Sequence, residues 1–236
     1  MNDFIKNHIR DLKKEFINPE LELKALLKNS LIKKKEIILS NFKIEDIDLF
    51  KFNISFQRRI KHEPISKIFN IKNFWKYDFY VDHNVLDPRP DTELIIEKVI
   101  DFFPDKSKNL KILDMFTGSG CLAISLAKEY PNSSVTAIDI SEKAINIAKK
   151  NAKKLHCENQ VNFVNCNLIN HVSNYDIVTA NPPYLSEKEY NNTSKEIQLF
   201  EPKIAFVASE NGYGFYKQIA EILSSLLHSH SRSFIE

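Results

Sequence analysis

Residues 180–185, ANPPYL, place an amide, two prolines and an aromatic ring directly after the apolar run YDIVT. Proline has no backbone N–H group, so Pro182 and Pro183 end the strand that this run predicts. The side-chain oxygen of Asn181 and the carbonyl of Pro182 could accept the two N–H groups of one planar nitrogen, beside the flat face of Tyr184. We interpret the stretch as a clamp for a planar NH2 group, either a carboxamide or a base amine. The alternative is a rigid turn after a strand.

A glycine-containing turn within residues 112–124, ILDMFTGSGCLAI, indicates a second site. Gly118 and Gly120 allow the backbone to approach a ligand closely, and the helix expected after them offers free N–H groups. The next predicted strand ends in Asp139, which is placed to accept hydrogen bonds from the two hydroxyl groups of a ribose. This spacing favours a nucleoside ligand over an ordinary tight turn. The chain contains no G-x-x-x-x-G-K-[ST] sequence, which excludes a P-loop.

Composition limits the class of protein. The 236 residues carry a net charge of +2, which shows no strong preference for nucleic acid or a membrane surface. Cys121, Cys157 and Cys166 have no C-x-x-C spacing, and the histidines have no ligand spacing, so we expect neither a disulfide framework nor a metal site. Without a signal-like apolar start or a run of 18 apolar residues, we expect a soluble protein of the reducing cytoplasm.

The elements that position these residues differ between the front and the rest of the chain. Residues 1 to about 70 contain no glycine, and Ile5, Ile9 and Leu12 follow helical spacing, which predicts a small helical bundle. After an aromatic hairpin, strands and helices alternate, which predicts an α/β fold with a parallel sheet that binds ligands beyond the carboxyl ends of its strands. The expected strands are 111–116, 134–140, 161–166, 175–180 and one from 233, preceded by a helix over 212–230 whose tail carries His228 and His230.

Several stretches together resemble one family of enzymes. The turn from Asp114 to Gly120, Asp139 and the NPPY sequence look like the site of an S-adenosylmethionine-dependent amino-methyltransferase. More specific pieces are HEP (62–64), FW (74–75), PRPDTEL (88–94) and FEP (200–202). These are similar to the HemK/PrmC family, which methylates the side-chain amide of the glutamine in the Gly-Gly-Gln loop of peptide chain release factors. The resemblance covers the chain from about residue 60 to its end.

The resemblance implies a Rossmann-like class I methyltransferase sheet with an N-terminal helical bundle. It implies a helical substrate-docking domain in residues 1–72, a β-hairpin linker in 73–87 and an S-adenosylmethionine-binding methyltransferase domain in 88–236. The front of the chain matches no motif of the family. The implied partners are peptide chain release factors, for a monomer that contacts no membrane and binds no nucleic acid directly.

The family's site residues carry over onto matching positions of this chain. The implied substrate-binding residues are Asn181, Pro182, Pro183 and Tyr184, of which Asn181, Pro182 and Tyr184 are the implied catalytic residues. The implied cofactor-binding residues are Phe116, Thr117, Gly118, Ser119, Gly120, Asp139, Asn167, Leu168 and Asn181. Arg89 and Glu93 are implied to shape the site. Catalysis would come from positioning the nitrogen beside a sulfonium methyl group rather than from a strong base.

Four positions depart from the family pattern. Phe116 stands where glycine is usual; its ring would obstruct the cofactor, and it would be strained if the position needs a positive φ. Asn167 replaces an acidic residue, and Asp87 stands where an apolar residue is usual. The chain ends at Glu236, within the expected fifth strand, so we expect the C-terminal strands to be truncated and a sheet edge to be exposed.

Three functions follow as hypotheses. The first is methylation of the release-factor glutamine. The second is N6-methylation of adenine in nucleic acid, because a base amine fits the same clamp; such enzymes usually carry a basic recognition domain, and nothing here is strongly basic. The third is an inactive, truncated remnant of the family. Cofactor binding separates the third from the other two, and the choice of substrate separates the first from the second.

Overall fold

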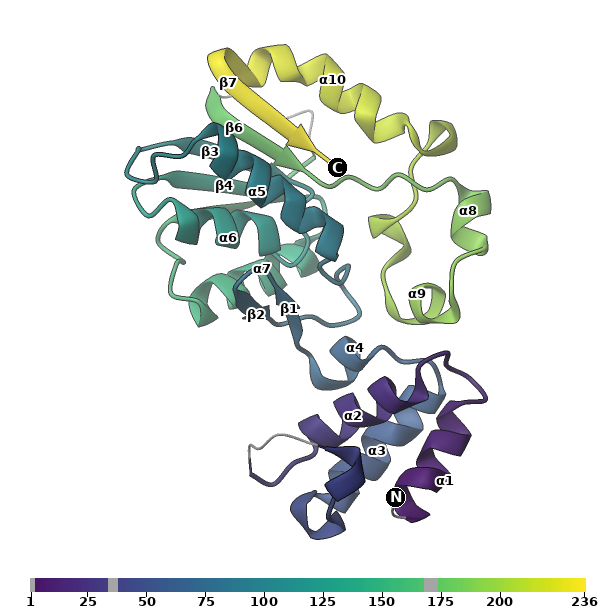
Figure 1. Ribbon diagram of the computed structural model, residues 1–236. Coiled ribbons are helices and arrows are strands. Elements are labelled where there is room, and N and C mark those ends of the chain that lie inside the picture. Colours follow the sequence, from purple (N-terminus) through teal and green to yellow (C-terminus); the bar gives the residue numbers. More distant parts are fainter. Residues whose placement is uncertain (1–2, 34–37, 168–173) are drawn as a thin grey trace. The chain divides into compact units, whose positions relative to one another are not determined.

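This computed structural model describes residues 3–33, 38–167 and 174–236, and the chain divides into two compact units, Met1–Asn70 and Ile71–Glu236 (Figure 1). Each unit has a hydrophobic core of its own. The hairpin belongs to the second unit, whereas we expected a separate linker segment. None of the described helices is long and apolar enough to cross a membrane.

The first unit is helical, as its spacing predicts. Its elements are α1 (Asp3–Leu12), α2 (Pro19–Asn29), α3 (Leu49–Ile60), α4 (Ile65–Phe69) and the 3-10 turns η1 (Leu39–Asn41) and η2 (Ile44–Asp46). Pro19 opens α2, where its missing N–H group costs no helical hydrogen bond. The guanidinium of Arg59, only 4% exposed, is matched by two hydrogen bonds of 2.7 and 2.9 Å to the carboxylate of Glu22. This pair ties α3 to α2 beside the core.

The second unit combines a hairpin, a five-stranded sheet and the helices that cover it. The strands are β1 (Lys72–Phe74), β2 (Tyr77–Phe79), β3 (Lys111–Met115), β4 (Ser134–Asp139), β5 (Val161–Asn165), β6 (Tyr175–Ala180) and β7 (Leu227–Ile235). The helices are α5 (Glu93–Phe102), α6 (Cys121–Glu129), α7 (Glu142–Lys154), α8 (Glu187–Asn191), α9 (Lys195–Phe200) and α10 (Gly214–Leu226), with 3-10 turns η3 (Pro90–Thr92), η5 (Lys203–Ala205) and η6 (Glu210–Gly212).

The sheet is parallel throughout, in the order β5-β4-β3-β6-β7, which confirms the predicted α/β class. Met115 at the end of β3 lies opposite Ile138 of β4 and Ala180 of β6. Because these strands run in one direction, the loops after β3, β4 and β6 all leave from the same edge of the sheet. The two sequence motifs, far apart along the chain, therefore meet there.

Successive residues of each central strand face opposite cores. Ile112 belongs to the core that α5 and α6 cover, together with the hairpin. Leu113 belongs to the core that α10 covers. Figure 1 shows α10 beside β7, with α5 and α6 crossing in front of the strands. Both faces of the sheet are covered, as the nearly continuous apolar strands require.

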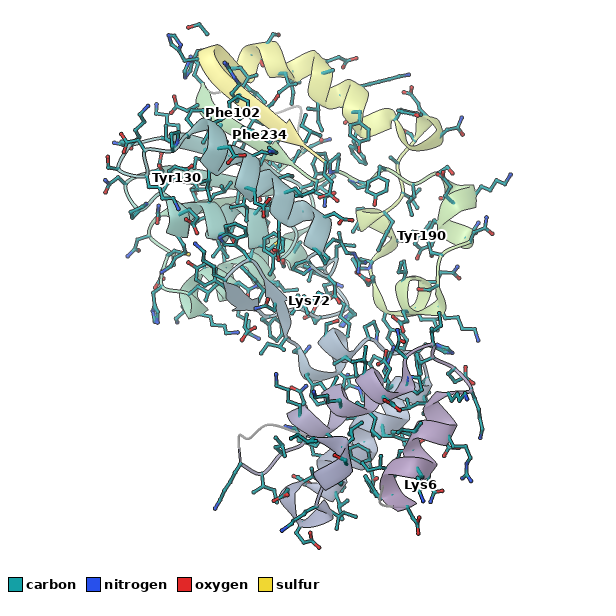
Figure 2. The ribbon with its side chains drawn as sticks, viewed as in Figure 1. Lys6, Lys72, Phe102, Tyr130, Tyr190 and Phe234 are labelled. Atoms are coloured by element: carbon teal, nitrogen blue, oxygen red, sulfur yellow. The ribbon has the colours of Figure 1, made fainter. Side chains whose placement is uncertain are left out.

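The last strand is longer than expected. It begins at Leu227 rather than near residue 233, so His228 and His230 lie in β7 and not in a helix tail. The strand pairs with β6 at Leu227, opposite Tyr175, and, after an irregularity, from Arg232 to Ile235, which lies opposite Ala180. Phe234 packs edge-on against Phe102 of α5, with ring centroids 5.7 Å apart (Figure 2). The expected fifth strand is therefore formed and paired with β6, and it lies at an edge of the sheet.

Asp114 lies fully buried in β3 and joins two strands. The hydroxyl of Thr117 donates to its Oδ2 at 2.6 Å, and the hydroxyl of Thr179, on β6, donates to its Oδ1 at 2.8 Å. Burial raises the pKa of this carboxyl to about 6 from 3.8, because the charged form loses its hydration; the two hydroxyl groups offset part of that effect.

Replacing Asp114 with asparagine keeps the shape of the side chain and removes its charge. Since the folded pKa lies above the ordinary value, the carboxyl's contribution to stability is complete below 3.8 and is lost as the pH rises through about 6. We expect the free energy of unfolding of the wild type to fall by about 2 kcal/mol relative to Asp114→Asn between about pH 4 and about pH 7. Urea denaturation at a series of pH values measures the free energy of unfolding. Asp101→Asn, which removes the charge of an exposed carboxylate, is the control. If the free energies of unfolding of wild type and Asp114→Asn changed with pH in parallel, the raised pKa of Asp114 would be contradicted.

Candidate active site

The turn after β3 adopts a conformation that favours glycine at several positions. Phe116 has a φ of +59°, and Gly118 and Gly120 have φ values of +53° and +81°. A side chain at Gly120 would place its Cβ 3.0 Å from Cβ of Ala148 and Cδ1 of Ile124, so glycine there also permits close packing of α6 on α7. The departure at Phe116 is therefore strained, because the left-handed region costs a non-glycine residue roughly 1–2 kcal/mol.

Asp139, at the end of β4, fixes this turn from the neighbouring strand. Its Oδ2 accepts the N–H group of Gly118 at 2.9 Å, and its Oδ1 accepts the N–H group of Ser141 at 2.8 Å. Burial raises the pKa of the carboxyl, while these two N–H groups act in the opposite direction. Each oxygen keeps a lone pair for a further donor such as a ribose hydroxyl.

Two cavities adjoin at this edge of the sheet and share Leu86, Phe116, Gly118 and Asn181 in their linings. The larger measures about 870 Å³ including its open mouth. Of the predicted site residues, the larger cavity is lined by Phe116, Gly118, Asp139, Asn167, Asn181 and Pro183. The smaller is lined by Phe116, Thr117, Gly118, Ser119 and Asn181. The structure thus brings the glycine turn, the acidic strand end and the NPPY sequence into one continuous space.

Among the described residues, three predicted site residues stand apart from this space. Gly120 is the N-cap of α6 and lines neither cavity. Pro182 and Tyr184 are outside the two linings, as far as the described residues define them. Pro182 is buried, whereas the ring of Tyr184 is 51% exposed and so accessible for stacking. Leu168 lies outside the described residues.

A buried carboxylate connects two of the recognised stretches across the cavities. Glu201, from FEP, accepts the N–H group of Asp87 at 2.8 Å and Nη2 of Arg89 at 2.7 Å. Its side chain is only 3% exposed and its bond to Asp87 is buried, whereas the Arg89 side chain is 34% exposed. Leu86 and Pro202, the neighbours of this clasp, both line the larger cavity. The hydrogen bonds of Glu201 thus connect the segment that contains Leu86 with the segment that contains Pro202. This arrangement is compatible with the site-shaping role predicted for Arg89.

The chain after NPPY is held by a second segment. Leu185 donates its N–H group to the carbonyl of Phe206 at 2.8 Å and accepts the N–H group of Ala208 at 2.9 Å. Gly212, with a φ of +96°, passes so close that a Cβ there would lie 2.2 Å from the carbonyl oxygen of Tyr184. Only glycine permits this approach, so the segment around Gly212 packs directly against the backbone of Tyr184.

Asn181 itself is oriented by two acceptors. Its Nδ2 donates to Oγ1 of Thr92 at 2.9 Å and to Oε2 of Glu236 at 2.8 Å. Thr92 lies at the N-cap position of α5 but makes no capping bond, and its hydroxyl accepts from Asn181 instead. Because both amide hydrogens are engaged, Oδ1 remains as the polar atom that can accept a hydrogen bond in the cavity.

The residues present fit S-adenosylmethionine. The hydroxyl of Ser119 is buried in the smaller cavity and makes no hydrogen bond to any described residue, so it can bond to a polar ligand. Asp139 would hold the ribose in the larger cavity. The ring of Phe215 lines the larger cavity and supplies an apolar surface suited to a flat base.

Sequence reasoning missed part of this site. The additional lining residues include Asn84, Val85 and Leu86, which follow the hairpin, and Ile140 and Phe215. The segment before PRPDTEL could have been found, because it leads directly into a recognised stretch. Phe215 carries no local signal, since it reaches the cavity only through the packing of α10 on the sheet. Glu236 and Thr92 were likewise not identified as partners of Asn181.

Replacing Phe116 with glycine tests whether its ring obstructs the cofactor. Glycine relieves the positive φ and opens the region that the two cavities share, so we expect S-adenosylmethionine to bind about tenfold more tightly. Titration calorimetry measures the affinity, with Phe102→Leu as a control at an aromatic outside both linings. Unchanged or weaker binding by Phe116→Gly would show that the ring supports the ligand instead of obstructing it.

Comparison with known proteins identifies the family. A family model described as the methyltransferase small domain matches residues 90–201. A release factor glutamine methyltransferase of Buchnera aphidicola subsp. Baizongia pistaciae is 38% identical over 98% of this chain and 85% of its own length. One of Flavobacterium psychrophilum is 36% identical over 87% of this chain and 74% of its own length.

Proteins named bifunctional methyltransferase are also similar. One of Rickettsia bellii is 34% identical over 93% of this chain, which spans 45% of that protein. The chain thus covers most of the two release factor glutamine methyltransferases and about half of this longer relative. The 38% identity to the Buchnera protein, over 98% of this chain and 85% of that protein, shows that this chain belongs to the family of S-adenosylmethionine-dependent release factor glutamine methyltransferases.

Proposed function

We propose that this chain transfers a methyl group from S-adenosylmethionine to the side-chain amide nitrogen of the glutamine in the Gly-Gly-Gln motif of peptide chain release factors. The observation that carries the proposal is Asn181, which lines both cavities while its Nδ2 is already engaged by two acceptors. Its free Oδ1 suits a donor, and a primary carboxamide has two N–H donors.

The residues of the clamp would act by positioning. S-adenosylmethionine would supply an electrophilic methyl group. The N–CH3 bond would form as the S–CH3 bond breaks, S-adenosylhomocysteine would leave, and the methylated nitrogen would lose one N–H proton to solvent water. Oδ1 of Asn181 and the carbonyl of Pro182 would accept the two N–H groups of the glutamine amide and fix its plane. No described residue donates a hydrogen bond to that carbonyl. The exposed ring of Tyr184 would cover the amide. Holding the nitrogen in line reduces the entropic part of the barrier.

A protein substrate is better supported than a nucleic-acid substrate. The release factor glutamine methyltransferases of Buchnera aphidicola and Flavobacterium psychrophilum are similar over most of their length. Residues 76–236, which include the site, contain 21 acidic and 17 basic residues. A nucleic-acid enzyme needs a cationic surface to neutralise phosphates. We accordingly propose a release factor as partner, a monomeric enzyme and a cytoplasmic location.

The substrate assay uses the full chain, S-adenosylmethionine with a labelled methyl group, a release factor, and an adenine-containing oligonucleotide. Label on the Gly-Gly-Gln glutamine, located by mass spectrometry, is the expected result. Label on the oligonucleotide alone would make the chain an adenine methyltransferase. Absence of transfer by a folded chain that binds the cofactor would contradict both activities, and absence of cofactor binding would indicate an inactive remnant.

The variant Asn181→Ala removes the acceptor that holds the nitrogen. We expect kcat to fall by about a hundredfold or more, as when one preorganised hydrogen bond to a reacting group is lost, while the affinity for S-adenosylmethionine changes little. Steady-state methylation and calorimetry measure the two quantities. Asn132→Ala, at an exposed amide that bonds the carbonyl of Ser107, is the matched control. Methylation by Asn181→Ala at the wild-type rate would refute the clamp.

A further inference from the structure

The two acceptors of Asn181 come from opposite parts of the second unit. Thr92 ends the turn before α5, and Glu236 follows β7, yet their oxygen atoms lie 2.9 and 2.8 Å from the same Nδ2. Neither residue lines the larger cavity, and Glu236 lines neither one, within the part of the chain that the structure describes. Glu236 therefore contacts the site through the amide of Asn181, whereas Thr92 bonds to the same amide and also lines the smaller cavity.

Chemistry decides which way this amide points. An ionised carboxylate accepts hydrogen bonds and donates none, so only the NH2 end of Asn181 is compatible with Glu236. The reversed amide would place Oδ1 against a carboxylate oxygen and leave two donors toward the cavity. A substrate nitrogen that itself carries two N–H groups could not bond to those donors. The Asn181 amide can therefore bind the substrate nitrogen only when Oδ1, and not the NH2 group, faces the cavity.

We propose that Thr92 and Glu236 are positioning residues that fix Asn181 with its side-chain oxygen toward the substrate nitrogen. This inference rests on the proposed transfer to an amide nitrogen. Glu236 also polarises the amide, because a hydrogen bond to a charged acceptor draws electron density through the amide toward Oδ1. That oxygen becomes a stronger acceptor for a nitrogen that turns positive as the methyl group arrives.

Both positioning residues are themselves held in place. Thr92 is 3% exposed and follows Pro90, whose ring restricts the backbone of the turn. Glu236 donates its backbone N–H group to the carbonyl of Ala180 at 3.0 Å, and its backbone oxygen accepts the hydroxyl of Tyr216 at 2.8 Å. The carboxylate is thereby placed beside the residue that follows Ala180, which is Asn181.

The first test separates turnover from binding in the full chain. We expect Thr92→Val, which keeps the shape and loses the acceptor, to lower kcat about fivefold to tenfold, and Thr92→Ser to restore it to within about twofold of wild type. Glu236→Leu should lower kcat about tenfold to a hundredfold, since the lost hydrogen bond is to a charged group. The affinity for S-adenosylmethionine, measured by calorimetry, should be unchanged in all three. Wild-type kcat in both Thr92→Val and Glu236→Leu would overturn the inference.

A double-mutant cycle distinguishes action through Asn181 from a structural effect. In the Asn181→Ala background, measured with labelled cofactor over long incubations, Glu236→Leu should change the residual rate less than about twofold. A loss as large as in the wild-type background would mean that Glu236 acts by another route, and would refute the positioning role.

A measurement without the reaction keeps this inference separate from the proposed function. The side-chain NH2 signal of Asn181 in 15N-labelled protein is assigned by its disappearance in Asn181→Ala. With both hydrogens bonded, its exchange with solvent should be slow, and Thr92→Val and Glu236→Leu should each accelerate it. Slow exchange in a wild type that methylates nothing would uphold the orientation while the proposed function fails. Fast exchange in the wild type would overturn the inference.

Discussion

The buried carboxyl of Asp114 is the interaction on which the site depends. Through Thr117 it holds the turn after β3, and through Thr179 it holds β6, the strand that leads into Asn181. A charged group without water is costly, and the rise of its pKa to about 6 expresses that cost. The cost of burying this carboxyl is offset because the one side chain fixes the spacing between the turn that would bind the cofactor and the strand that leads into Asn181.

Strain and close packing surround this point. Phe116 occupies a left-handed conformation that glycine adopts freely, yet its ring packs against Phe215 and contributes to the cavity wall. Gly120 and Gly212 occupy positions where a Cβ would collide, with α7 in one case and with the carbonyl of Tyr184 in the other. With four glycines in the whole chain, three are at backbone positions with positive φ in or beside the site. Glycine is thus retained where geometry requires it.

The walls of the site are joined by polar contacts between distant parts of the sequence. Glu201 accepts hydrogen bonds from Asp87 and Arg89, more than 100 residues earlier. Asn181 reaches Thr92 and Glu236 in the same manner. Partial burial strengthens such contacts, and they are specific because a donor held away from water needs its partner. The stretches PRPDTE and FEP therefore act as parts of one frame around the cavities.

The sequence alone determined the α/β class, the helical front and the meeting of the glycine turn, Asp139 and Asn181, because strand and helix periodicity and proline and glycine chemistry are local. It also indicated the strain at Phe116, since φ preferences belong to single residues. Tertiary structure decided the rest. The start of β7 at Leu227, against a helical pattern, depends on pairing with β6, and the hydroxyl of Thr92 serves Asn181 instead of capping α5. Both outcomes are set by partners distant in sequence, which outweigh local propensity once packing brings them together.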